Sequence, residues 1–95
     1  MTRREVVEID LRPVQAGADL QRILSDALDF PGWYGMNWDA FWDTITGLVE
    51  MPKTLRLVGW GEINERMPRD AGIMKQCLDD MADELPELAS KVEYV

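Results

Sequence analysis

The most informative segment of the sequence is Phe30-Pro31-Gly32-Trp33-Tyr34-Gly35-Met36-Asn37-Trp38-Asp39-Ala40-Phe41-Trp42-Asp43. It holds six of the eight aromatic residues of the chain, together with two glycines and two aspartates. Residues 31–36 are rich in turn formers, and Gly32 and Gly35 are free to adopt positive φ. Asn37 is a suitable N-cap for a helix. The segment therefore predicts a loop that leads into a helix with both aromatic and acidic side chains.

The residues that precede this segment predict a strand and a helix. Val6 to Leu11 predict a strand, because Val7, Ile9 and Leu11 alternate with Glu8 and Asp10 in the period-two pattern of a half-buried strand. Asp19 is a suitable N-cap, and the apolar residues after it recur at the spacing of an amphipathic helix. This helix should end before Pro31, because proline disfavours helical geometry at the residue before it.

The residues that follow the segment predict two more helical elements and two strands. The helix capped by Asn37 should run to about Glu50, because Pro52 lies shortly beyond it. The remaining predicted elements are a largely buried strand at 54–59, a short irregular helical turn at 60–67, a helix capped by Asp70 and ended by Pro86, and a final strand at 92–95.

Strands separated by helices predict an α/β domain with a small three-stranded parallel sheet and right-handed crossovers. Helices must cover the faces of such a sheet for it to be stable. A chain of 95 residues can bury one modest core, so we expect a single domain over residues 1–95.

The composition restricts the classes of function. A net charge of −8 disfavours direct binding to nucleic acid and favours a basic partner. Histidine, the commonest general acid-base and metal ligand, is absent, and Cys77 is the only cysteine. We therefore expect no cofactor and no metal. The first residues lack the apolar segment of a signal peptide, and nothing approaches a membrane span, so we expect a cytoplasmic protein without membrane contact.

The helix after Asn37 has a narrow acidic stripe. At 100° per residue, Asp39, Asp43, Thr46 and Glu50 lie on one side, next to an apolar arc that has Trp42 at its edge. Asp39 and Asp43 are roughly 6 Å apart along the axis, at 1.5 Å per residue. Two carboxylates on a rigid helix suit the sites that a nuclease uses for successive phosphates. The alternative is an ordinary solvated face on a core helix.

Two further features favour a binding surface. Trp33 and Tyr34 lie outside the helix and beside glycines, where rings are prone to exposure, and such side chains often anchor interfaces. The sequence leaves open whether Trp33 and Trp42 are exposed. Asp80 belongs to a second acidic face, on the helix after Asp70. It would extend the first acidic surface if the two helices packed side by side, and the sequence leaves that packing open.

The segment from Trp33 to Asp43, followed by Thr46-Gly47-Leu48-Val49-Glu50 and Pro52, resembles the barstar family of ribonuclease inhibitors. The shared spacing is tyrosine-glycine-x-asparagine-x-aspartate-alanine-x-tryptophan-aspartate. The resemblance implies a barstar-like fold and an intracellular inhibitor, not an enzyme. Such an inhibitor blocks the active site of a basic, secreted-type, guanyl-specific ribonuclease similar to barnase. We expect a monomer when free and a one-to-one complex with the nuclease.

The resemblance also implies roles for individual residues. Asp43 would enter the phosphate site of the nuclease, against its arginines and catalytic histidine, and Asp39 would pair with a further basic group. Trp33 stands where the family commonly has a tyrosine that stacks on the nuclease, and Asp80 stands where the best-known member has a glutamate. The predicted partner-binding set, in which Gly35, Asn37 and Trp42 shape the contact surface, is Trp33, Tyr34, Gly35, Asn37, Asp39, Trp42, Asp43, Thr46 and Asp80.

Two other functions fit the same residues. Asp39 and Asp43 have the separation of a carboxylate pair in glycoside hydrolysis, but one convex helix in a small domain offers little cleft for a sugar. The chain could also be an interaction or immunity module that neutralises a toxin nuclease or another basic partner. Identification of the partner separates that function from ribonuclease inhibition.

Overall fold

The computed structural model describes residues 3–95, so Met1 and Thr2 of the predicted domain lie outside the described residues. Three strands form one parallel sheet in the order β1-β2-β3, with Leu55 of β2 opposite Val7 of β1 and Val92 of β3. The predicted α/β class with a small parallel sheet is confirmed. The elements are β1 (Val6–Asp10), α1 (Gly17–Ala27), α2 (Trp38–Gly47), β2 (Thr54–Val58), α3 (Trp60–Arg66), α4 (Pro68–Glu84) and β3 (Lys91–Tyr94).

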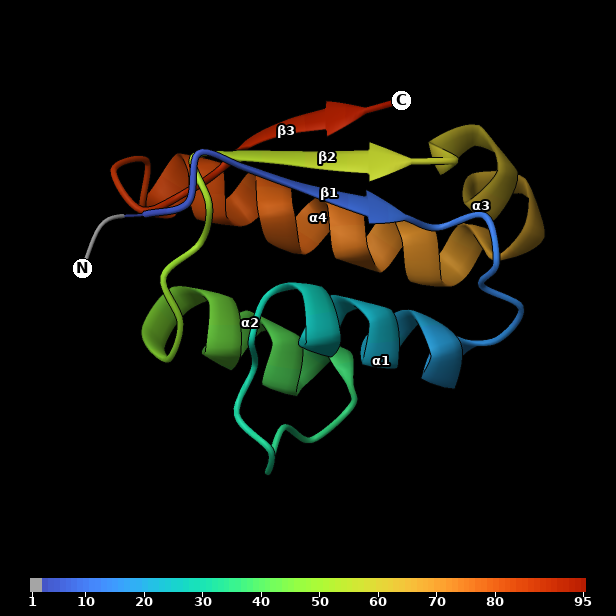
Figure 1. The fold of residues 1–95 in the computed structure, drawn as a ribbon, viewed down its shortest axis with the longest axis horizontal. Helices are drawn as coiled ribbons and strands as arrows, with labels where there is room; N and C mark the ends of the chain where they lie inside the picture. Colours follow the sequence, from blue (N-terminus) through green and yellow to red (C-terminus); the bar gives the residue numbers. More distant parts are fainter. Residues whose placement is uncertain (1–2) are drawn as a thin grey trace.

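α1, α2 and α4 lie on one side of the sheet, and α3 lies beyond the end of β2 (Figure 1). Both crossovers step in the same direction across the sheet, so right-handed connections place their helices on the same face. Ile9 and Leu55 point into this covered face and are buried. On the other face, Arg56 pairs with Glu93 at 2.8 Å and with Glu8 at 3.3 Å. The expected helical cover is therefore present on one face only, and solvated ion pairs occupy the other.

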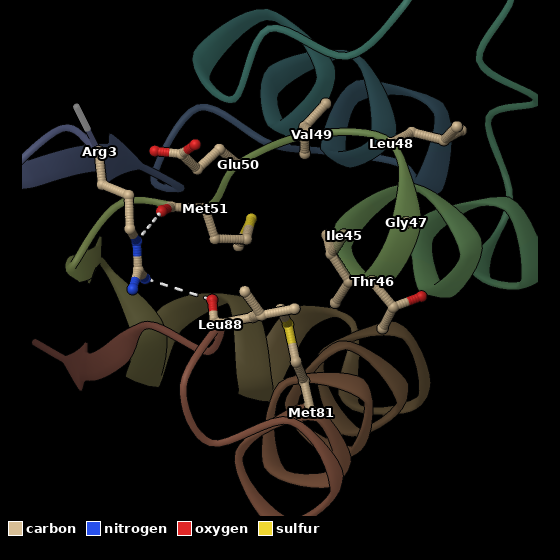
Figure 2. A pocket seen from close by; sticks show the side chains of 10 residues that line it. All are labelled: Arg3, Ile45, Thr46, Gly47, Leu48, Val49, Glu50, Met51, Met81 and Leu88. Atoms are coloured by element: carbon tan, nitrogen blue, oxygen red, sulfur yellow. Dashed lines mark hydrogen bonds between the residues drawn. The ribbon is translucent and has the colours of Figure 1, made fainter. Parts of the chain in front are cut away.

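α2 and α4 run side by side in the same direction. Trp38 at the start of α2 contacts Asp70 at the start of α4, and Ile45 near the end of α2 lies with Met81 of α4 around one pocket (Figure 2). Phe41 and Ile45 anchor α2 in the core and are 1% exposed or less. This packing leaves the acidic side of α2 facing α4.

Two helices begin earlier than the sequence predicts. Ala16, and not Asp19, is the N-cap of α1, and the Asp19 carboxylate accepts a hydrogen bond from the Ala16 N–H at 3.1 Å. α4 begins at Pro68, which tolerates the first helical turn because its missing N–H is not needed there. Asp70 is therefore inside the first turn, where its carboxylate accepts a hydrogen bond from the Trp38 indole.

The other boundaries differ by a few residues. α2 ends at Gly47 and not near Glu50, consistent with the low helix propensity of glycine. Residues 60–66 form a regular helix and not an irregular turn, β1 ends at Asp10, and β3 begins at Lys91.

Candidate partner-binding site

Asn37 joins the loop before α2 to the helix itself. Its Oδ1 accepts a hydrogen bond from the Ala40 backbone N–H at 2.8 Å, and its Nδ2 donates to the Gly35 carbonyl oxygen at 3.1 Å. The predicted N-cap is confirmed. The second bond also fixes the last turn of the loop relative to the first turn of the helix.

The left-handed backbone conformation in this loop occurs at Met36, with φ of 56°. Gly32 and Gly35 are free to adopt positive φ but do not adopt it. A Cβ atom at Gly35 would lie 3.2 Å from the Ala40 Cβ atom, so a larger residue there would crowd the first turn of α2. A non-glycine residue in this region is unfavourable by roughly 1 kcal/mol or more, so the contacts around Met36 must impose it.

The two adjacent rings of the loop have different environments. Trp33, whose exposure the sequence leaves open, is 72% exposed, whereas Tyr34 is 7% exposed although its position beside glycines makes its ring prone to exposure. The Tyr34 ring packs on Phe30 with centroids 4.7 Å apart, and its hydroxyl donates to the side-chain oxygen of Gln21. Burial raises the pKa of Tyr34 to about 12. Tyr34 thus supports the loop from beneath, and Trp33 projects from it.

A groove of about 650 Å³ lies between α2 and α4. It brings together Asp39, Asp43 and Asp80, so the packing required for Asp80 to extend the acidic surface is present. Glu84 adds a fourth carboxylate that we did not predict, although it stands one helical turn after Asp80 on the same face. The lining residues are Trp38, Asp39, Trp42 and Asp43 from α2, and Ile73, Cys77, Asp80 and Glu84 from α4.

The four carboxylates of the groove are not neutralised within the described part of the chain. Among residues 3–95, no lysine or arginine nitrogen lies within 4.0 Å of the carboxylates of Asp39, Asp43, Asp80 or Glu84. Asp80 accepts only a neutral hydrogen bond, from the Gln76 amide at 2.7 Å. Like charges held on one surface repel one another, and a cationic partner would remove that repulsion.

The floor of the groove is less polar than its rim. The rings of Trp38 and Trp42 are partly buried in it, and Cys77 is half-buried. Burial, with the nearby charges of Asp80 and Asp39, raises the pKa of the Cys77 thiol. Acidic rims around an apolar floor suit a lysine or arginine side chain, which carries its charge on an aliphatic stem.

Thr46 does not line this groove. Its hydroxyl donates to the Trp42 carbonyl oxygen at 2.6 Å, and its side chain lines a neighbouring pocket of about 540 Å³ with Met81 and Leu88 (Figure 2). The predicted site is therefore divided between the groove, the loop that carries Trp33, and this second pocket at the end of α2.

Two kinds of site are not found in the described part of the chain. Residues 3–95 contain no group of three or more histidine, cysteine, aspartate or glutamate side chains positioned to hold a metal ion. Over the same residues, no helix has both the length and the apolar composition that a membrane crossing requires.

Comparison with known proteins places the chain in a family. The profile of the family described as Barstar (barnase inhibitor) matches residues 4–95, which include the loop and both walls of the groove. The chain is also 38% identical, over 64 residues, to a Bacillus subtilis (strain 168) protein named "Putative ribonuclease inhibitor YrdF". That similarity covers 67% of this chain and 70% of the relative. Both descriptions are of inhibitors, in agreement with the prediction that the chain is not an enzyme. The chain belongs to the barstar family.

Proposed function

We propose that this protein inhibits a basic ribonuclease by placing the groove between α2 and α4, with the loop at 31–36, against the active site of the nuclease. The observation that carries the proposal is the set of four carboxylates in one groove that form no ion pair with any lysine or arginine of residues 3–95. Membership of the barstar family supports a ribonuclease as the target. The finer proposal is a secreted-type, guanyl-specific enzyme, bound one to one by a cytoplasmic monomer.

The carboxylates act as substitutes for the phosphates of RNA. Asp39 and Asp43 project one helical turn apart from α2, so they present two negative charges to cations that the nuclease holds ready for its substrate. The helix is already folded in the free inhibitor, and binding therefore orders few groups. The acidic field of the groove also speeds the encounter with a basic surface.

The loop contributes in two ways. Trp33 offers an exposed ring on the loop that leads into α2, and in this proposal it covers the rim of the contact and excludes water. Tyr34 and Asn37 act indirectly, because the first is buried and the second is used in capping and in holding Gly35. In this proposal they fix the direction in which Trp33 and α2 face the nuclease.

The test is a titration of the purified protein into a barnase-like ribonuclease, with RNA cleavage measured at low and at moderate salt. We expect inhibition to reach completion at one equivalent and to weaken as salt is added. Absence of inhibition would contradict the proposed target class, and pull-down of a different nuclease would then favour the immunity alternative.

The single thiol of the chain tests the location of the contact. Cys77 lines the groove, so the ribonuclease should slow its alkylation by iodoacetamide. The control is the same reaction with an equal concentration of a basic protein that is not a nuclease. Inhibition with an unchanged alkylation rate would show that the nuclease binds a surface other than the groove.

A further inference from the structure

One hydrogen bond connects the two walls of the groove at the end where both helices begin. The indole Nε1–H of Trp38 donates to Asp70 Oδ1 at 2.9 Å, and both groups are partly buried. The Trp38 ring also packs edge-on against Phe41, with centroids 5.3 Å apart, so it is held from the core side as well. Trp38 lines the groove, but Asp70 does not.

This bond matters for the position of α2 relative to α4, because the acidic residues of α2 make no polar side-chain contact with α4 in the described part of the chain. Among residues 3–95, no side-chain hydrogen bond or ion pair joins Asp39 or Asp43 to α4. At the opposite end of the two helices, Ile45 and Met81 are both buried and line one pocket. Among residues 3–95, the Trp38–Asp70 bond is the one side-chain hydrogen bond between α2 and α4, so it bears directly on the separation of the α2 carboxylates from Asp80.

The start of α1 also lies near Asp70. An ideal Cβ atom on Gly17 would lie 3.5 Å from Asp70 Oδ2, an ordinary van der Waals distance. A hydrogen bond to a carboxylate is stronger than one between neutral groups. The starts of α1, α2 and α4 thus converge on Asp70.

We infer that Trp38 and Asp70 form a positioning pair that sets the width of the groove, and with it the match between the acidic walls and the partner. The identity of the partner rests on the proposed function. The change in the width of the groove is expected in the free protein and does not depend on that function. Asp70 is the positioning residue and does not touch the nuclease. Without the bond, α2 can shift relative to α4, and binding must then reorder the two helices at a cost in affinity.

The test compares Asp70→Ala with Asp70→Asn and Trp38→Phe. The two Asp70 variants remove the same charge, but asparagine keeps an oxygen that can accept the indole N–H. In the free proteins, we expect Asp70→Ala and Trp38→Phe to alkylate Cys77 about tenfold faster than the wild type, and Asp70→Asn to stay within about twofold. Urea unfolding of each variant shows whether global opening accounts for any difference.

Inhibition of a barnase-like ribonuclease supplies the second readout. We expect Asp70→Ala to weaken inhibition about tenfold and Asp70→Asn to remain close to the wild type. Asp80→Ala should have a smaller effect in the Asp70→Ala background than in the wild type, because a displaced wall no longer presents Asp80 correctly. A role in stability alone would leave the effect of Asp80→Ala unchanged.

Two results would overturn the inference. The first is equal behaviour of Asp70→Ala and Asp70→Asn in both assays, which would assign the effect to charge. The second is an alkylation rate in Asp70→Ala that equals the wild-type rate. Because alkylation needs no partner, a wild-type protein that inhibits no ribonuclease would refute the proposed function while the alkylation series still decides the role of the pair.

Discussion

Asp43 stands in the middle of α2, where its charge does not help the helix. Aspartate has a low helix propensity in such a position, and Asp39 places a like charge one turn away. We expect Asp43→Ala to raise the free energy of unfolding by about 0.5–1 kcal/mol. The same change should weaken ribonuclease inhibition by at least about thirtyfold, because it leaves a cation of the nuclease unpaired. Urea unfolding and an inhibition titration measure the two effects.

Asp83→Ala is the matched control for that variant. Asp83 is exposed on α4 and does not line the groove, yet its removal changes the net charge by the same amount. Inhibition by this control should stay within about threefold of the wild type. If both variants lost inhibition equally, net charge and not the position of Asp43 would explain the result.

Tyr34 connects the loop to α1 through Gln21, which is 5% exposed. Tyr34→Phe removes the hydroxyl that donates to the Gln21 oxygen and leaves this buried acceptor unpaired. We expect the free energy of unfolding to fall by about 1–2 kcal/mol, as measured by urea denaturation. An unchanged stability would mean that water replaces the lost donor.

The buried tyrosines also predict a loss of stability at alkaline pH. Burial raises the pKa of both Tyr34 and Tyr94 to about 12, from an ordinary value of 10.0. The folded state therefore favours the neutral phenols. Their contribution to the free energy of unfolding is fully present below pH 10 and is lost as the pH rises towards 12. Unfolding by urea should become easier over that interval. The double variant Tyr34→Phe, Tyr94→Phe should show a smaller decline than the wild type.

At the level of secondary-structure elements, Asn37 has two functions that substitutions can separate. Asn37→Ala loses both the cap of α2 and the bond to Gly35, so the free energy of unfolding should fall by about 1 kcal/mol. Asn37→Asp keeps an oxygen for the Ala40 N–H but has no N–H group for the Gly35 carbonyl. We expect this variant to remain nearly as stable as the wild type and to inhibit the ribonuclease more weakly, because the loop is no longer tied to the helix. Full inhibition by Asn37→Asp would show that the cap alone positions the loop.

The elements also show which signals the sequence carries. Asn37 was predictable because its cap is made within four residues along the chain. Asp70 was assigned to a cap that it does not form, since its partner is an indole 32 positions away. The burial of Tyr34 was not predictable for the same reason, because Gln21, which accepts its hydroxyl, lies 13 positions away on α1. Local bonds were therefore predictable from residue type and spacing, whereas bonds between elements required the fold.

For the whole molecule, the net charge of −8 predicts how inhibition depends on ionic strength. Salt screens long-range attraction over a Debye length of about 10 Å at 0.1 M. The association rate constant with a basic ribonuclease should therefore fall as salt increases, while the dissociation rate constant changes little. Stopped-flow mixing at several salt concentrations separates the two constants. A salt-insensitive association rate would contradict electrostatic steering.

The order of strands and helices was predictable across the molecule because their periodicities alternate clearly, and this order predicts a parallel sheet. The face of the sheet that the helices cover was not predictable, because it depends on the strand order β1-β2-β3 as well as on crossover handedness. The pairing of Arg56 with Glu8 and Glu93 was not predictable either, because it requires all three strands to be in register.

The shared direction of α2 and α4 gives the groove an electrical polarity. Both helices begin at the end marked by Trp38 and Asp70, and their last turns, which end at Gly47 and Glu84, lie at the other. The aligned peptide dipoles of a helix leave about half a negative charge at its C-terminus, so the pair adds about one charge at that end of the groove and the opposite charge at the other. A basic protein that approaches this surface meets a gradient of potential along the groove, and the gradient selects one orientation before any side chain makes contact.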